Sequence, residues 1–85
     1  MKIVYTKHAL EKLDSANAKS LEISRKKIDF ILKNPKSTNF KINPHRKTGD
    51  LSKELSLCVI YKIEDGIIKV ITFYPAKKGR YESKV

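Results

Sequence analysis

The stretch Leu57-Cys58-Val59-Ile60-Tyr61-Lys62-Ile63-Glu64-Asp65-Gly66-Ile67-Ile68-Lys69-Val70-Ile71-Thr72-Phe73-Tyr74 decides the fold. Two runs rich in β-branched and aromatic residues flank Asp65-Gly66, and this dipeptide is typical of a two-residue hairpin turn of type I′. The stretch therefore predicts an antiparallel hairpin. A regular ladder counted outward from the turn has these pairs: Ile63–Ile68, Lys62–Lys69, Tyr61–Val70, Ile60–Ile71, Val59–Thr72, Cys58–Phe73 and Leu57–Tyr74.

The two faces of this hairpin differ in character. One face, which includes Tyr61, is apolar almost throughout and is expected to pack against helices, with Tyr61 in the core. On the other face Lys62 opposes Lys69, and like charges directly across from each other repel, so that end is expected in water. Cys58, expected opposite Phe73, is predicted to be a small buried residue.

The first half of the chain predicts a short strand over residues 2–5 followed by two helices. Thr6 is a good N-cap for a first helix over residues 7–18. Ser24 is the expected N-cap of a second helix, whose apolar residues recur at helical spacing. Asn34-Pro35 ends this second helix, because the residue before proline is steered out of the α region.

Between the second helix and the hairpin turn the signals are weaker. Residues 37–42 predict a short strand and residues 43–50 a basic loop, and residues 51–63 are expected to contain a long strand. The resulting order β-α-α-β-β-β predicts a single α+β domain over residues 1–85. We expect two layers, with both N-terminal helices packed on one face of a mainly antiparallel sheet.

Composition narrows the functional classes. The single cysteine, Cys58, excludes an intrachain disulfide and a cysteine-based zinc site, and the two histidines have no nearby carboxylate cluster, so no metal site and no cofactor are expected. No glycine-rich nucleotide-binding loop is present. No signal-peptide pattern and no apolar run of membrane-spanning length are present either, so the expected location is the cytoplasm, with no membrane partner.

Charge points to a polyanionic partner. The chain carries a formal net charge of +10, from 19 Lys and Arg against 9 Asp and Glu. The basic residues concentrate in residues 36–53 and 75–85, which is the distribution that a one-sided electrostatic footprint requires. RNA is therefore the expected partner, and the alternative is a solvated lysine-rich surface without a specific ligand.

Several motifs resemble the RelE/ParE-type toxin superfamily. They are His45-Arg46-Lys47-Thr48-Gly49-Asp50-Leu51, Val59-Ile60-Tyr61-Lys62-Ile63 and Arg80-Tyr81. The start Tyr5-Thr6-Lys7-His8-Ala9 and the ending Tyr74-Pro75 followed by Arg80-Tyr81 are similar to a group of small relatives of that superfamily. The resemblance spans nearly the whole chain. It implies a RelE-like toxin domain of a toxin–antitoxin system, an endoribonuclease that cuts mRNA without a metal, free or on the ribosome, and a cognate antitoxin.

Metal-free cleavage of RNA needs a base, an acid and cations that stabilise the phosphorane. Arg80 and Lys77 are the candidate cations, and His8 and Tyr81 are the candidates for moving protons. Together these four form the predicted catalytic set. The residues predicted to bind RNA are Lys7, Arg46, Lys47, Lys53 and Lys78.

One departure from the superfamily keeps other functions open. RelE-type strands usually read tyrosine-arginine-valine where this chain has Leu57-Cys58-Val59, so Cys58 replaces an arginine that would bind the scissile phosphate. The alternatives to a nuclease are a non-catalytic module that binds RNA or a partner, and a toxin that inhibits a protein target. An antitoxin segment is expected either on the open sheet face, at Ile60, Ile71 and Phe73, or around the helices. The sequence assigns no oligomeric state.

Overall fold

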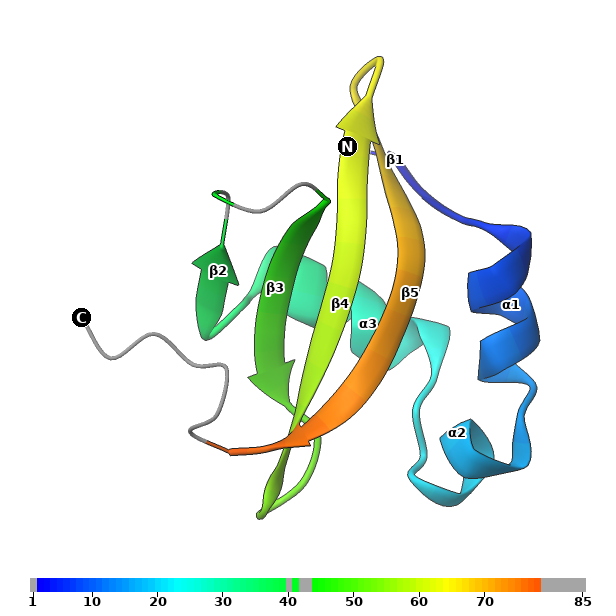
Figure 1. Ribbon diagram of the computed structural model, residues 1–85, viewed down its shortest axis with the longest axis vertical. Coiled ribbons are helices and arrows are strands. Elements are labelled where there is room, and N and C mark those ends of the chain that lie inside the picture. The colour runs from blue at the N-terminus through cyan, green and yellow to red at the C-terminus, as the bar shows by residue number, and fades with distance from the viewer. Residues whose placement is uncertain (1, 40, 42–43, 79–85) are drawn as a thin grey trace.

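The protein is an α+β fold, as its sequence predicts. The computed structural model describes residues 2–39, 41 and 44–78. In chain order the elements are β1 (Lys2–Tyr5), α1 (Lys7–Leu13), α2 (Ala16–Ser20), α3 (Arg25–Lys33), β2 (Ser37–Asn39), β3 (His45–Asp50), β4 (Leu55–Glu64) and β5 (Ile67–Lys77) (Figure 1).

The strands form one five-stranded sheet in the order β1-β5-β4-β3-β2. β1 pairs with β5 in parallel, and every other pairing is antiparallel. α3 crosses one face of the sheet, and α1 runs beside β5 (Figure 1). The core lies between α3, α1 and this face. Its buried residues are Ala9, Ala18, Ile23, Ile28, Ile31, Leu32, Leu57, Val59, Tyr61, Val70 and Phe73.

The hairpin turn between β4 and β5 is confirmed. Asp65 and Gly66 have φ angles of 51° and 73°, the left-handed values that a type I′ turn requires of both central residues. Lys62 and Lys69 do pair across the strands, and Glu64 lies 3.8 Å and 3.4 Å from their ammonium groups. One carboxylate therefore offsets the repulsion between the two lysines.

Beyond the third pair from the turn the predicted register is wrong, because the hairpin contains a β-bulge. Tyr61 pairs with Val70 and Ile60 pairs with Thr72, which leaves Ile71 as the extra residue. One inserted residue turns every later side chain of β5 to the opposite face. The pairs observed after the bulge are Val59–Phe73, Cys58–Tyr74 and Leu57–Pro75.

The bulge places Phe73 in the core. Its side chain is 1% exposed and belongs to the buried cluster, so it is not on the open sheet face where Ile60, Ile71 and Phe73 were expected to meet an antitoxin segment. Cys58 is buried as predicted, but it lies opposite Tyr74 rather than Phe73.

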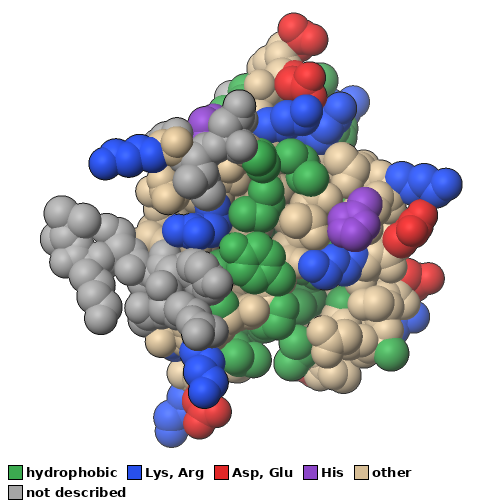
Figure 2. Space-filling view, in the orientation of Figure 1, with side chains coloured by type: hydrophobic (Ala, Val, Ile, Leu, Met, Phe, Trp, Pro, Cys, Tyr) green, Lys and Arg blue, Asp and Glu red, His purple; other side chains and the backbone are tan. Residues whose placement is uncertain are grey.

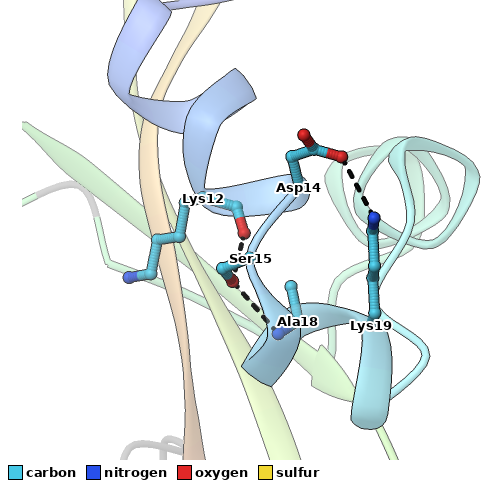
Figure 3. Close-up of polar contacts among 5 residues, drawn as sticks. All are labelled: Lys12, Asp14, Ser15, Ala18 and Lys19. Carbon is cyan, nitrogen blue, oxygen red and sulfur yellow. Dashed lines mark hydrogen bonds and ion pairs between the residues drawn. The ribbon is translucent and has the colours of Figure 1, made fainter.

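The single N-terminal helix predicted from the sequence is in fact two helices, α1 and α2. The Ser15 hydroxyl donates to the carbonyl of Lys12 at 2.6 Å and accepts from the amide of Ala18 at 3.2 Å (Figure 3). Ser15 thus caps the start of α2 and turns the chain there. An ion pair of 3.2 Å between Asp14 and Lys19 joins the two helices across the break.

α3 begins and ends as its sequence predicts. Ser24 is the N-cap and accepts from the amide of Lys27 at 3.2 Å, and Asn34 is the C-cap directly before Pro35. The buried residues of α3 are Ile28, Ile31 and Leu32.

The segment before β4 differs most from prediction. Residues 43–50 contain β3 rather than a loop, and β4 starts at Leu55 because the amides of Leu51 and Ser52 both donate to the Leu55 carbonyl at 3.0 Å. β3 pairs with β4 along its whole length. At Gly49 a Cβ atom would lie 2.7 Å from Cγ1 of Ile31, so glycine at this position lets α3 pack closely on β3.

Gly49→Ala is expected to destabilise the fold by about 1–3 kcal/mol, because the added methyl group overpacks the contact between β3 and α3. Urea denaturation measures the loss. In an Ile31→Ala background the same change is expected to cost less, since the clashing atom is gone. An equal cost in both backgrounds would contradict this explanation.

Candidate nucleic-acid interface

Four lysines gather at the end of the sheet where β5 stops. Lys36 precedes β2, Lys53 lies between β3 and β4, and Lys77 and Lys78 are the end of β5 and the next residue. The pairing of Leu55 with Lys77 brings the start of β4 to the end of β5, and the Lys36 amide donates to the Thr48 carbonyl at 2.7 Å. We call Lys36, Lys53, Lys77 and Lys78 the basic rim.

Asp50 organises two of these lysines. Its carboxylate lies 3.0 Å from the ammonium of Lys36 and 3.1 Å from that of Lys78. Hydrogen bonds from Lys36 first and Lys78 second lower the pKa of Asp50 below its usual range. The Lys78 amide also donates to the Glu54 carbonyl at 3.1 Å, which fastens the end of β5 to the turn before β4.

The other two rim lysines carry charge toward solvent. Lys53 and Lys77 are exposed, and neither makes an ion pair with any residue in the described part of the chain. Exposed lysines at one end of a sheet favour the binding of an anion such as a phosphate.

Lys47, predicted to bind RNA, points to the helix layer instead. Its ammonium donates to the Leu32 carbonyl at 2.8 Å in the last turn of α3 and lies 5.3 Å from the centre of the Tyr61 ring. A cation there satisfies a free carbonyl and complements the helix dipole. Arg46 lies elsewhere, in register with Asn39 and Ile60.

His8 lies far from the rim. The Thr6 amide donates to the Val70 carbonyl at 3.0 Å, so α1, with Lys7 and His8 exposed in its first turn, begins beside the middle of β5. Lys77 follows Val70 by seven positions, one of which is the bulge residue Ile71, so about six strand rises, or about 20 Å, lie between them. The described residues therefore do not bring His8 and Lys77 together, and Arg80 and Tyr81 lie outside them.

Lys12 is a residue that sequence reasoning missed. It follows His8 by one helical turn, and its side chain points toward β5 (Figure 3). Its ammonium donates to the Phe73 carbonyl and, at 3.3 Å, to the Thr72 hydroxyl, and burial lowers its pKa. The spacing of four residues from His8 was visible in the sequence, but the acceptors depend on the bulge.

The view onto the sheet face away from α3 shows how charge and apolar surface are distributed. An apolar stripe follows the strands, and Lys and Arg side chains lie around it (Figure 2). Within residues 2–39, 41 and 44–78 no group of three His, Cys, Asp or Glu residues is placed to hold a metal ion.

Tyr61 is buried, as predicted, and the side chains of His45 and Lys47 lie next to its ring. The Tyr61 side chain is fully buried, its hydroxyl has no hydrogen-bond partner among the described residues, and desolvation raises its pKa. The His45 ring lies 5.5 Å away, centre to centre. This group faces the helix layer, so it lies apart from the basic rim.

Comparison with protein-family models, curated proteins and solved structures finds no match to this chain. The RelE/ParE resemblance thus stays a prediction from the sequence motifs. In the part of the chain that the structure describes, no helix is long and apolar enough to cross a membrane.

Replacing Lys12 with methionine is expected to destabilise the protein by about 1 kcal/mol, because the Phe73 carbonyl loses its donor. Thermal and urea denaturation measure this. The matched control is Lys19→Met, which removes only an exposed ion pair with Asp14 and is expected to cost under about 0.5 kcal/mol. Equal effects of the two changes would contradict a special role for Lys12.

The ion pairs of Asp50 predict a pH-dependent stability. Because its pKa is lower in the folded than in the unfolded chain, its contribution is present above the unfolded value of about 3.9 and is lost as pH falls through the folded value. Asp50→Asn is expected to cost about 1 kcal/mol or less at pH 7, in keeping with exposed pairs. Unfolding curves of both proteins should converge near pH 2, and a gap independent of pH would contradict the assignment.

Proposed function

We propose that this protein binds RNA through the basic rim and acts as a toxin-like, metal-independent endoribonuclease in the cytoplasm. The observation that carries the proposal is the gathering of four lysines, Lys36, Lys53, Lys77 and Lys78, from three separate segments at one end of the sheet. A chain with a net charge of +10 that concentrates exposed cations there suits a phosphate backbone.

The catalytic chemistry belongs at the same end in this proposal. Lys77 supplies charge to the phosphorane, and Arg80 and Tyr81, which follow Lys78 by two and three residues, supply a bidentate cation and a proton-transfer group. His8 lies in the first turn of α1, which begins beside Val70 rather than at the rim, and it does not take part in this step. In this proposal His8, together with Lys7, contacts a part of the RNA strand that lies away from the cleaved bond.

A non-catalytic RNA- or partner-binding module is the second candidate. Two observations favour it: the described residues place no histidine at the rim, and Cys58, which stands where the superfamily has a phosphate-binding arginine, is fully buried. In both candidates an antitoxin is the expected protein partner. A toxin that inhibits a protein target remains the third possibility and is separated from the others by the experiment below.

Mapping of mRNA 5′ ends in cells that express the protein tests the nuclease. We expect new ends with the wild type and none with Arg80→Ala/Tyr81→Phe, and we expect purified activity, with ribosomes supplied, to survive EDTA. Growth arrest without new ends would instead indicate a protein target. If the cells show neither new mRNA ends nor growth arrest, and the purified protein binds RNA, the result would support the non-catalytic binding module.

Neutralising the rim tests RNA binding separately from cleavage. For Lys53→Gln/Lys77→Gln the logarithmic salt slope of binding to a single-stranded RNA is expected to fall by about 1.4, because each phosphate contact contributes about 0.7. Fluorescence anisotropy at several salt concentrations measures the slope. The control Lys62→Gln/Lys69→Gln removes the same charge from the hairpin and should leave the slope unchanged. Equal slopes for the two variants would contradict binding at the rim.

A further inference from the structure

One carboxylate of the basic rim contacts two lysines at once. Asp50 is the last residue of β3, and its two oxygens are used separately. Oδ2 lies 3.0 Å from the Lys36 ammonium, and Oδ1 lies 3.1 Å from the Lys78 ammonium. Two cations therefore converge on a single anionic group, with one oxygen for each. A phosphodiester, with its two non-bridging oxygens, offers a pair of lysines the same arrangement of charged acceptors.

The positions of these two lysines do not depend on the carboxylate. The Lys36 amide donates to the Thr48 carbonyl at 2.7 Å, and the Lys78 amide donates to the Glu54 carbonyl at 3.1 Å. These main-chain hydrogen bonds anchor both residues to the same end of the sheet. We therefore expect the two side chains to stay near each other when Asp50 is replaced.

The two ion pairs are open to exchange with a ligand. The side chains of Lys36, Lys78 and Asp50 are 59%, 34% and 44% exposed, so an anion from solvent can reach them. Exposed ion pairs contribute little net free energy, because water and salt compete with them. Hydrogen bonds from Lys36 and then Lys78 lower the pKa of Asp50, so at neutral pH the carboxylate is charged and only another anion replaces it.

A second carboxylate in the molecule bridges two lysines in a different way. Glu64 contacts Lys62 and Lys69 through one oxygen, Oε1, at 3.8 Å and 3.4 Å. This group lies at the hairpin turn, at the opposite end of β4 from the rim. Because both lysines share one oxygen at longer distances, the group does not reproduce the acceptors of a phosphodiester. It therefore serves as an internal control.

We propose that Lys36 and Lys78 form a binding site for one phosphodiester of an RNA strand, and that Asp50 fills this site in the free protein and is displaced by the phosphate. The inference rests on the RNA binding proposed above and not on cleavage. An RNA strand that contacts Lys53 and Lys77 reaches the site only by leaving the Asp50 carboxylate beside its own phosphate. Asp50 thus acts as a built-in competitor that limits the adhesion of a chain of net charge +10 to polyanions.

Binding of the full chain to a single-stranded RNA, followed by fluorescence anisotropy at several salt concentrations, tests the inference. Asp50→Asn is expected to bind about fivefold more tightly at about 0.1 M salt, because a like charge beside the phosphate is removed. The magnitude of the logarithmic salt slope is expected to rise by about 0.7, the contribution of one phosphate. Unfolding curves of the variant show that it is folded under the conditions of the assay.

Two carboxylate controls match this change in charge. Glu54→Gln removes a carboxylate from the same end of the sheet, and this carboxylate makes no ion pair within the described ranges. Glu64→Gln releases two lysines, but at the hairpin turn. Both controls should leave the salt slope unchanged. A slope that rises equally with Glu54→Gln would show an effect of net charge only and would overturn the inference.

Further substitutions locate the gain. Adding Lys36→Gln/Lys78→Gln to Asp50→Asn is expected to abolish the increase in slope, because the phosphate loses both of its cations. Adding Lys62→Gln/Lys69→Gln instead removes the same charge from the hairpin and should keep the increase. Equal losses from the two additions would also contradict a phosphate site at Lys36 and Lys78.

The results separate failure of the inference from failure of the proposed function. If Lys53→Gln/Lys77→Gln lowers the slope as predicted but Asp50→Asn leaves binding unchanged or weaker, RNA binds at the rim and the inference alone is wrong. If the wild type binds no RNA, or if no rim variant alters the slope, binding at the rim is wrong and the inference falls with it. Mapping of mRNA ends reports on cleavage independently of these measurements.

Discussion

The β-bulge at Ile71 determines the arrangement of most of this molecule. It turns Phe73 into the core, where the helices cover it, and it changes the face on which every later residue of β5 lies. The carbonyl groups near the bulge accept hydrogen bonds from α1 and its N-cap: the Thr6 hydroxyl donates to the Ile71 carbonyl at 3.0 Å and the Lys12 ammonium donates to the Phe73 carbonyl. β1 pairs with β5 only over residues 67–70. Beyond that point the carbonyl groups of Ile71 and Phe73 accept hydrogen bonds from side chains rather than from another strand.

The same geometry separates the functional surfaces. α1 is held beside the middle of β5, so His8 lies away from the lysines at the end of that strand. α3 covers the sheet face that carries Val59 and Phe73, where glycine at position 49 lets Ile31 approach. The basic rim, the start of α1 and the outer side of α3 are therefore three distinct surfaces, and the RNA binding that we propose concerns the first of them.

Local chemistry made much of the fold predictable, and non-local packing accounts for the rest. The turn at Asp65-Gly66 and the helix bounded by Ser24 and Asn34 follow from turn and capping preferences, which act within a few residues. The bulge was not predictable in this way, because no glycine or proline marks Ile71 and its benefit is the burial of Phe73. β3 was missed because its sequence is polar; it is held as a strand by its antiparallel pairing with β4 and β2, and Gly49 lets α3 pack against it. For the site, sequence spacing located Lys77 and Lys78 at a sheet end, whereas the engagement of Lys47 by α3 and of Lys78 by Asp50 required the tertiary structure.

The most direct test of this account is the cross-strand register of β4 and β5 in solution, measured from NMR contacts between assigned side chains. The bulged register predicts contacts of the Val59 methyl groups with the Phe73 ring, and of Cys58 with Tyr74. Contacts of Val59 with Thr72 and of Cys58 with Phe73 would show a regular ladder, and they would contradict the account.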